Sequence, residues 1–235
     1  MLRVPWLLYL GAASVAIPPL AVLLLRRRPS GGAAWILAWS TLLTAEEAAG
    51  TWLASRDINN HWLGYVATPA AGALMLWALS LWQTRSAPRF AMRVAIPISL
   101  LVWTLVVTTV ENPRTFSTVA QPLASVLGLA AAAYTLVARS LEETEGLTRQ
   151  DWFWTCGGLA LYFGSASMLG PLATLLGGNL ALLARAYELK SVLDVMAHLA
   201  IARGITCRTQ VRPSGVSFSP ASSPSALSSS PSALR

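Results

Sequence analysis

The chain has 235 residues, of which 54% are hydrophobic and only 11% are charged, and its formal net charge is +7. Soluble domains carry about 25% charged residues, so this composition excludes an ordinary soluble globular protein. The basic residues border apolar segments and form no patch with interleaved aromatic side chains, which excludes nucleic-acid binding.

Seven apolar stretches, each close to the length of a membrane-spanning helix, cover most of the chain. They predict an all-α fold: a polytopic membrane protein whose seven-transmembrane helix bundle occupies residues 1–204. The predicted spans are residues 5–25, 33–54, 61–83, 94–110, 118–138, 152–176 and 184–203.

The first span is predicted to be retained rather than cleaved as a signal peptide. Its apolar run continues through Leu25 and stops at Arg26, whereas the apolar region of a signal peptide is about 7–15 residues long. Pro18 and Pro19 predict a kink, which membrane helices tolerate when neighbours satisfy the freed backbone groups.

The second span carries a polar face formed by Ser40, Thr44, Glu47 and Thr51, with Glu46 turned about 100° away from it. Glu47 lies roughly 10 Å below the outer end of the span. Because ionisable groups at membrane depth are costly, we expect this face to point into the bundle.

The seventh span has the longest polar stripe in the chain. Its members fall within about one 100° sector of the helix: Tyr187, Lys190, Ser191, Asp194 and His198. Lys190 lies at roughly the same depth as Glu47. We therefore hypothesise a Glu47–Lys190 ion pair between spans two and seven, which would neutralise two costly charges.

Residues 205–235 differ in composition from the rest of the chain. They are rich in Ser and Pro, and Ser-Pro-Ser-Ala-Leu occurs at 223–227 and again at 230–234. Too few large apolar groups are present to offset the entropy of ordering, so we predict a disordered cytoplasmic tail.

The arginines give the expected orientation. Twelve lie on alternate connections and in the tail, against four on the other side. Because Lys and Arg in short loops favour the cytoplasm, the richer side is expected there, with the N-terminus outside and the C-terminus inside a bacterial-type inner membrane. The twelve are Arg26, Arg27, Arg28, Arg85, Arg89, Arg93, Arg139, Arg149, Arg203, Arg208, Arg212 and Arg235.

Several functions fit the polar residues of spans two and seven. The simplest is a buried network that fixes helix register, and the others are a ligand or signal pocket, a solute or proton path, and catalysis. Lys190 is the only lysine, as a retinal Schiff base would require, but span three lacks acidic counter-ion positions. The chain has two histidines, His61 and His198, too few for a typical catalytic zinc site.

Two stretches carry recognisable aromatic and glycine patterns, one at the entry to span three and one in span six: 59–63 with Thr68 and Pro69, and 152–154 with 158–159 and 161–163. These stretches resemble uncharacterised bacterial seven-transmembrane proteins, some of which resemble the sensor regions of membrane histidine kinases. The resemblance implies a heptahelical sensor. The residues after Arg203 in this sequence are the Ser/Pro-rich segment and not a kinase domain, so we expect a signal to pass through a separate partner.

The sequence thus favours a non-enzymatic sensory or accessory membrane protein, with a small solute or proton-coupled transporter as the alternative. The site candidates are Thr44, Glu47, Tyr187, Lys190, Asp194 and His198. No metal or other cofactor is expected, and the expected partners are the lipid bilayer and a membrane or cytoplasmic signalling protein.

Overall fold

The part of the chain that the structure describes is built from helices. The computed structural model describes residues 6–115, 117–143, 146–176 and 179–207, with the backbone alone at 169–174, 176 and 180. No strand occurs in these ranges, so the all-α prediction is confirmed for them. The elements are α1 (Trp6–Ser14), α2 (Ile17–Leu24), α3 (Gly31–Ala54), α4 (His61–Leu81), α5 (Ser86–Thr109), α6 (Ala120–Glu142), the 3-10 turn η1 (Leu147–Arg149), α7 (Asp151–Leu176) and α8 (Leu180–Thr206).

The predicted kink in the first apolar stretch is confirmed. The stretch forms two helices, α1 and α2, whose axes differ in direction by 55°. The break precedes Pro18 and Pro19 in the first turn of α2, where the missing proline N–H groups interrupt the helical hydrogen-bond ladder.

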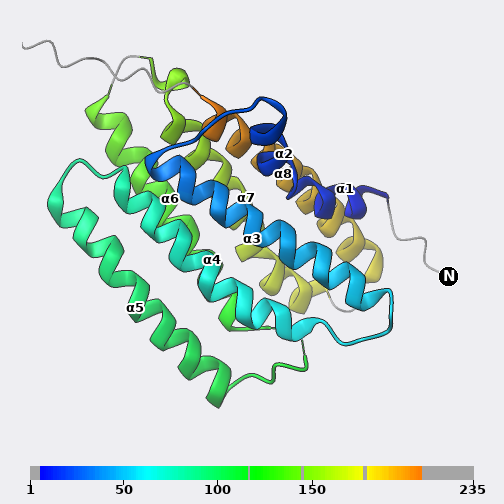
Figure 1. Cartoon of the computed structure of the whole chain (residues 1–235). Coiled ribbons are helices and arrows are strands. Elements are labelled where there is room, and N and C mark those ends of the chain that lie inside the picture. Colours follow the sequence, from blue (N-terminus) through cyan, green and yellow to red (C-terminus); the bar gives the residue numbers. More distant parts are fainter. Residues whose placement is uncertain (1–5, 116, 144–145, 177–178, 208–235) are drawn as a thin grey trace, which may run out of the picture.

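The helices lie side by side in one bundle (Figure 1). The pairs α7–α8, α6–α7 and α3–α4 make the most extensive contacts. The broken pair α1–α2 packs on α8, whereas α5 stands at one edge against α4 (Figure 1). Consistent with this edge position, large apolar side chains of α5 such as Leu101 and Leu105 are exposed.

The connections richest in arginine meet at one end of the bundle. Gln83, after α4, donates to Thr135 of α6 at 2.9 Å, and Arg85, before α5, lies 3.6 Å from Glu142 of α6. At the opposite end, the Asn59 amide donates to the carbonyl of Arg114 at 2.9 Å and joins the α3–α4 and α5–α6 connections.

Three helices of the described chain, α4, α5 and α6, are long and apolar enough to cross a membrane. The bent pair α1–α2 makes a fourth if it counts as one span. Helix α8 carries Glu188, Lys190 and Asp194 within two turns, and such charges lower the apolar character of a segment. Helix α5 begins at Ser86, before the predicted start of the fourth span at 94.

Small residues allow α7 and α8 to pack closely. A Cβ atom at Gly158 would lie 2.7 Å from the carbonyl oxygen of Ala197, whereas one at Gly157 would meet nothing within 4 Å. Close backbone approach through small residues is typical of helices that pack in membranes. Next to this contact, Leu159 and Ile201 are fully buried in the main apolar core.

Helix α6 is capped by a residue from the preceding connection. The carboxylate of Glu111 accepts hydrogen bonds from the backbone N–H groups of Thr118 (2.7 Å), Val119 (2.6 Å) and Ala120 (3.2 Å). The Ser117 hydroxyl donates to the same carboxylate at 3.0 Å. Burial raises the pKa of the Glu111 carboxyl, but the four hydrogen bonds outweigh it and leave this pKa below its ordinary value.

Candidate functional site

A cavity of about 360 Å³ lies among α1, α3, α4, α6, α7 and α8. Ligand sites for small molecules typically enclose about 300–1,000 Å³, so the size is adequate for a small ligand. The cavity is lined by five of the six residues that the sequence nominates, namely Glu47, Tyr187, Lys190, Asp194 and His198.

The sixth candidate, Thr44, lies on α3 outside the cavity lining and has a structural contact instead. Its hydroxyl is 2.7 Å from the carbonyl oxygen of Ser40 and 3.0 Å from that of Val15. Val15 occupies the break between α1 and α2, where helical carbonyls lose their usual partners. Thr44 therefore connects α3 to the break.

The centre of the polar stripe on α8 is a local ion pair. The Lys190 ammonium donates to the carboxylate of Asp194 one turn further along, and the other oxygen of Asp194 accepts a hydrogen bond from Ser165 of α7 at 3.3 Å. The Lys190 nitrogen also lies 5.8 Å from the centroid of the Tyr162 ring. Both charges of the pair thus have partners within α7 and α8.

The hypothesised Glu47–Lys190 ion pair does not form. Lys190 pairs with Asp194, and the ion pairs of the described residues include none between α3 and α8. An (i, i+4) partner on the same helix is already within reach, whereas a pair across the cavity would have to span open volume. Glu47 still faces the same cavity, together with its neighbour Glu46.

His198 is anchored at one ring nitrogen and lacks a partner at the other. Its Nδ1 lies 2.8 Å from the Ser14 hydroxyl of α1, which itself lies 2.6 Å from the carbonyl oxygen of Gly11. A hydroxyl has one proton and the carbonyl can only accept, so Ser14 donates to Gly11 and accepts from Nδ1–H. Nε2 is then an acceptor, and it is buried without a hydrogen-bond partner among the described residues.

Aromatic side chains form much of the wall beside these polar groups. Trp39 of α3 and Tyr162 of α7 meet edge to face with ring centroids 5.7 Å apart, and Phe163 lies beside Tyr162 at 5.1 Å. The Tyr162 ring also lies 5.4 Å from the imidazole of His198. The cavity therefore combines carboxylates, one ammonium and one imidazole with aromatic surfaces.

Sequence reasoning missed three residues of this site: Ser14, Glu46 and Tyr162. Glu46 had a usable signal, since two adjacent carboxylates inside one predicted span are costly and both call for a polar environment. Ser14 and Tyr162 had none, because serine and tyrosine are common in such helices and their partners lie far away along the chain.

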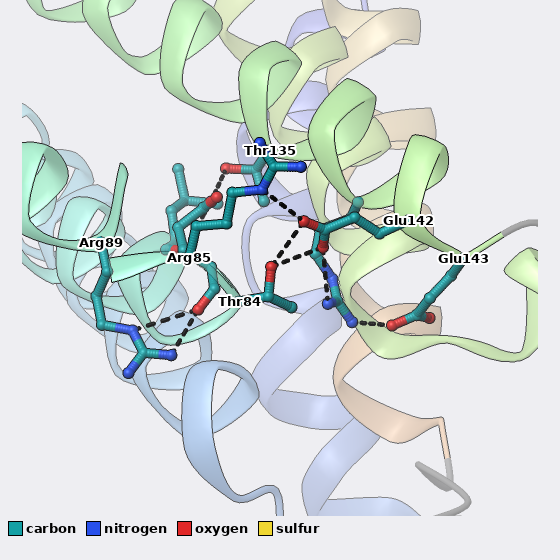
Figure 2. Close-up of polar contacts among 9 residues, drawn as sticks. Thr84, Arg85, Arg89, Thr135, Glu142 and Glu143 are labelled. Atoms are coloured by element: carbon teal, nitrogen blue, oxygen red, sulfur yellow. Dashed lines mark hydrogen bonds and ion pairs between the residues drawn. The ribbon is translucent and has the colours of Figure 1, made fainter. Parts of the chain in front are cut away.

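A second polar cluster joins the C-terminal ends of α4 and α6 to the start of α5 (Figure 2). The Thr84 hydroxyl lies 2.7 Å from both carboxylate oxygens of Glu142, which also pairs with Arg85. Arg139 forms ion pairs with Glu142 and Glu143. Arg89 donates to the carbonyl oxygen of Gln83 at 2.6 Å. These contacts join the ends of neighbouring helices and leave the Nε of Arg139 as a buried atom without a hydrogen-bond partner, and we interpret the cluster as structural.

No group of three or more His, Cys, Asp or Glu residues in the described ranges is arranged to hold a metal ion. Comparisons of the chain with protein-family models, with curated proteins and with solved structures gave no match.

Proposed function

We propose that the chain is a non-enzymatic sensory or accessory membrane protein that binds a small ligand in the cavity. The observation that carries this proposal is the convergence of ionisable side chains from α3 and α8 on one cavity of about 360 Å³. A purely structural polar network is expected to be close-packed and internally satisfied. Here Glu46 and Glu47 border open volume instead, and the buried Nε2 of His198 has no hydrogen-bond partner among the described residues.

The proposal includes seven membrane spans, with the N-terminus outside and the C-terminus in the cytoplasm of a bacterial-type inner membrane. Two observations support it. The eight α-helices of the described chain follow the seven apolar stretches in order when α1 and α2 count as one span. The connections rich in arginine meet at one end of the bundle, as the positive-inside rule requires.

A sensory role needs a route by which an occupied cavity is recognised. The resemblance to sensor regions of membrane histidine kinases favours a signalling partner in the membrane or the cytoplasm. The exposed apolar side chains of α5 offer such a partner, or the lipid, a contact surface.

A small solute or proton-coupled transporter is the second candidate, and one observation favours it. The break between α1 and α2 lies beside the cavity, which Gly11, Ala12 and Val15 help to line. Discontinuous helices at the substrate site are a recurring feature of secondary transporters.

Binding and flux measurements on the same sample separate the two candidates. The full chain in lipid nanodiscs would be tested by equilibrium dialysis against radiolabelled amines, carboxylates, sugars and neutral alcohols, and any bound compound would then be tested for uptake into proteoliposomes. A sensory protein is expected to bind a compound saturably without flux, and a transporter to bind and move it.

Variants then connect binding with the cavity. Asp194→Asn and His198→Ala should weaken binding, whereas Asp57→Asn, an exposed carboxylate on the α3–α4 connection, should not. Failure of every compound to bind would contradict both candidates.

A further inference from the structure

We propose that the cavity takes a small organic cation with N–H groups, such as an alkylammonium or arylalkylammonium ion. This inference rests on the proposed ligand-binding function and names the chemical class of the ligand. It follows from the charges, the hydrogen-bonding groups and the aromatic walls that meet in the cavity.

The charge of the cavity lining is unbalanced. Its ionisable carboxyl and amino groups belong to Glu46, Glu47, Lys190 and Asp194. Lys190 and Asp194 neutralise each other as an ion pair. Among the described residues neither Glu46 nor Glu47 takes part in a hydrogen bond or an ion pair, so the lining has two unpaired carboxyl groups and no unpaired cation. A cationic ligand offsets this charge, whereas an anion would add to it.

The hydrogen-bonding groups without partners are acceptors. Carboxylate oxygens can only accept hydrogen bonds when they are ionised, and the Nε2 of His198 is an acceptor because Nδ1 carries the proton. His198 is 2% exposed, and a buried acceptor that lacks a donor is costly. A ligand rich in N–H donors in the cavity supplies the hydrogen bonds that the carboxylates of Glu46 and Glu47 lack.

The chain already holds one ammonium group in this environment. The Lys190 ammonium lies between the Asp194 carboxylate and the Tyr162 ring, whose centroid is 5.8 Å away. Carboxylates and aromatic rings are the usual partners of organic ammonium ions in binding sites. The same two kinds of group recur on α3, where Glu46, Glu47 and the aromatic side chain of Trp39 all line the cavity.

The test compares probes of similar size and different charge on the full chain in lipid nanodiscs by isothermal titration calorimetry. The probes are 2-phenylethylammonium, its neutral analogue 2-phenylethanol, the anion 3-phenylpropionate, and trimethyl(2-phenylethyl)ammonium, which is cationic but has no N–H group. We expect 2-phenylethylammonium to bind at least about tenfold more tightly than the alcohol or the anion, and severalfold more tightly than the trimethyl ion.

Two isosteric variants assign the preference to the carboxylates. Glu46→Gln and Glu47→Gln should each weaken 2-phenylethylammonium binding about tenfold and leave 2-phenylethanol binding unchanged. Asp57→Asn is the matched control, because it removes a carboxylate outside the cavity and asparagine tolerates the positive φ of 57° at this position. The comparison of probes on the unaltered chain stands even if a variant fails to fold.

The outcomes distinguish the ligand class from the proposed function. If the alcohol or the anion binds as tightly as 2-phenylethylammonium, or if no ammonium probe binds, the cationic class is overturned. Saturable binding of some other compound of the dialysis panel would then still uphold a ligand-binding cavity. Absence of binding by every probe and every panel compound would overturn both.

Discussion

At the scale of single residues, the contact between Ser14 and His198 links the first helix to the last. These residues are 184 positions apart, and both side chains are buried. Loss of the serine hydroxyl would remove the side-chain acceptor of the Nδ1–H of His198, and a buried donor left unpaired costs about 1–3 kcal/mol. The bond also fixes which nitrogen of the imidazole is free to accept.

Ser14→Ala is therefore expected to lower the free energy of unfolding by about 1–3 kcal/mol. Ser55→Ala is a matched control, since Ser55 is exposed and, like Ser14, bonds the carbonyl three residues earlier, at 2.7 Å. Its effect should stay within about 0.5 kcal/mol. Unfolding of the purified chain in detergent, followed by tryptophan fluorescence, measures both. Equal effects of the two substitutions would contradict the role assigned to the inter-helix bond.

At the scale of elements, the start of α6 depends on a carboxylate outside the helix. The Glu111 carboxylate accepts hydrogen bonds from three backbone N–H groups that have no partner inside the first turn of α6. A negative charge at this position also interacts favourably with the helix dipole. The α5–α6 connection is thus held by one side chain that serves the helix after it.

This cap gives the stability of the chain a pH dependence with a definite sign. Folding lowers the pKa of the Glu111 carboxyl. The cap therefore stabilises the folded chain fully at pH values above the pKa that Glu111 has in the unfolded chain, and this stabilisation is lost as the pH falls through the pKa of Glu111 in the folded chain. Glu111→Gln should destabilise the chain by about 0.5–2 kcal/mol near neutral pH. The difference from the unaltered chain should shrink below about pH 4.

Unfolding midpoints of both proteins from about pH 7 down to about pH 3 test this expectation. Asp57→Asn, which removes an exposed carboxylate at the same end of the bundle, should leave the midpoint nearly unchanged over the whole range. A difference between Glu111→Gln and the unaltered chain that stays constant with pH would show that the carboxylate charge does not contribute.

At the scale of the whole molecule, the proposed orientation can be tested by cysteine labelling in intact cells. Starting from Cys156→Ala with Cys207→Ser, single cysteines would replace Ile58 on the α3–α4 connection and Thr148 in η1, both of which are exposed. A membrane-impermeant maleimide should label the first in intact cells and the second only after the membrane is opened. The reverse pattern would contradict an outer N-terminus.

The sequence predicted the order of the helices because apolar stretches alternate along the chain with polar connections. Helix α5 begins at Ser86, before the predicted fourth span, because Arg89 and Arg93 indicated a connection in the sequence, whereas Arg93 lies inside the helix with its guanidinium 4.7 Å from the centroid of the Trp77 ring. The sequence predicted a polar site between the helices that are now α3 and α8, and both line the cavity. It predicted Glu47 as the partner of Lys190, whereas the partner is Asp194. A helical wheel predicts which residues share one face of a single helix. It does not predict which residues of six different helices line one cavity.

The short segment at the break between α1 and α2 contacts both helices that carry the carboxylates of the cavity, α3 and α8. Ser14 bonds α8 through His198, and the next residue, Val15, bonds α3 through Thr44. The consecutive residues Ser14 and Val15 thus connect α8 with α3. A shift of α3 relative to α8 must break one of these two hydrogen bonds or turn the backbone at residues 14–15. The distance between α3 and α8 and the angle of the first helix are therefore mechanically coupled.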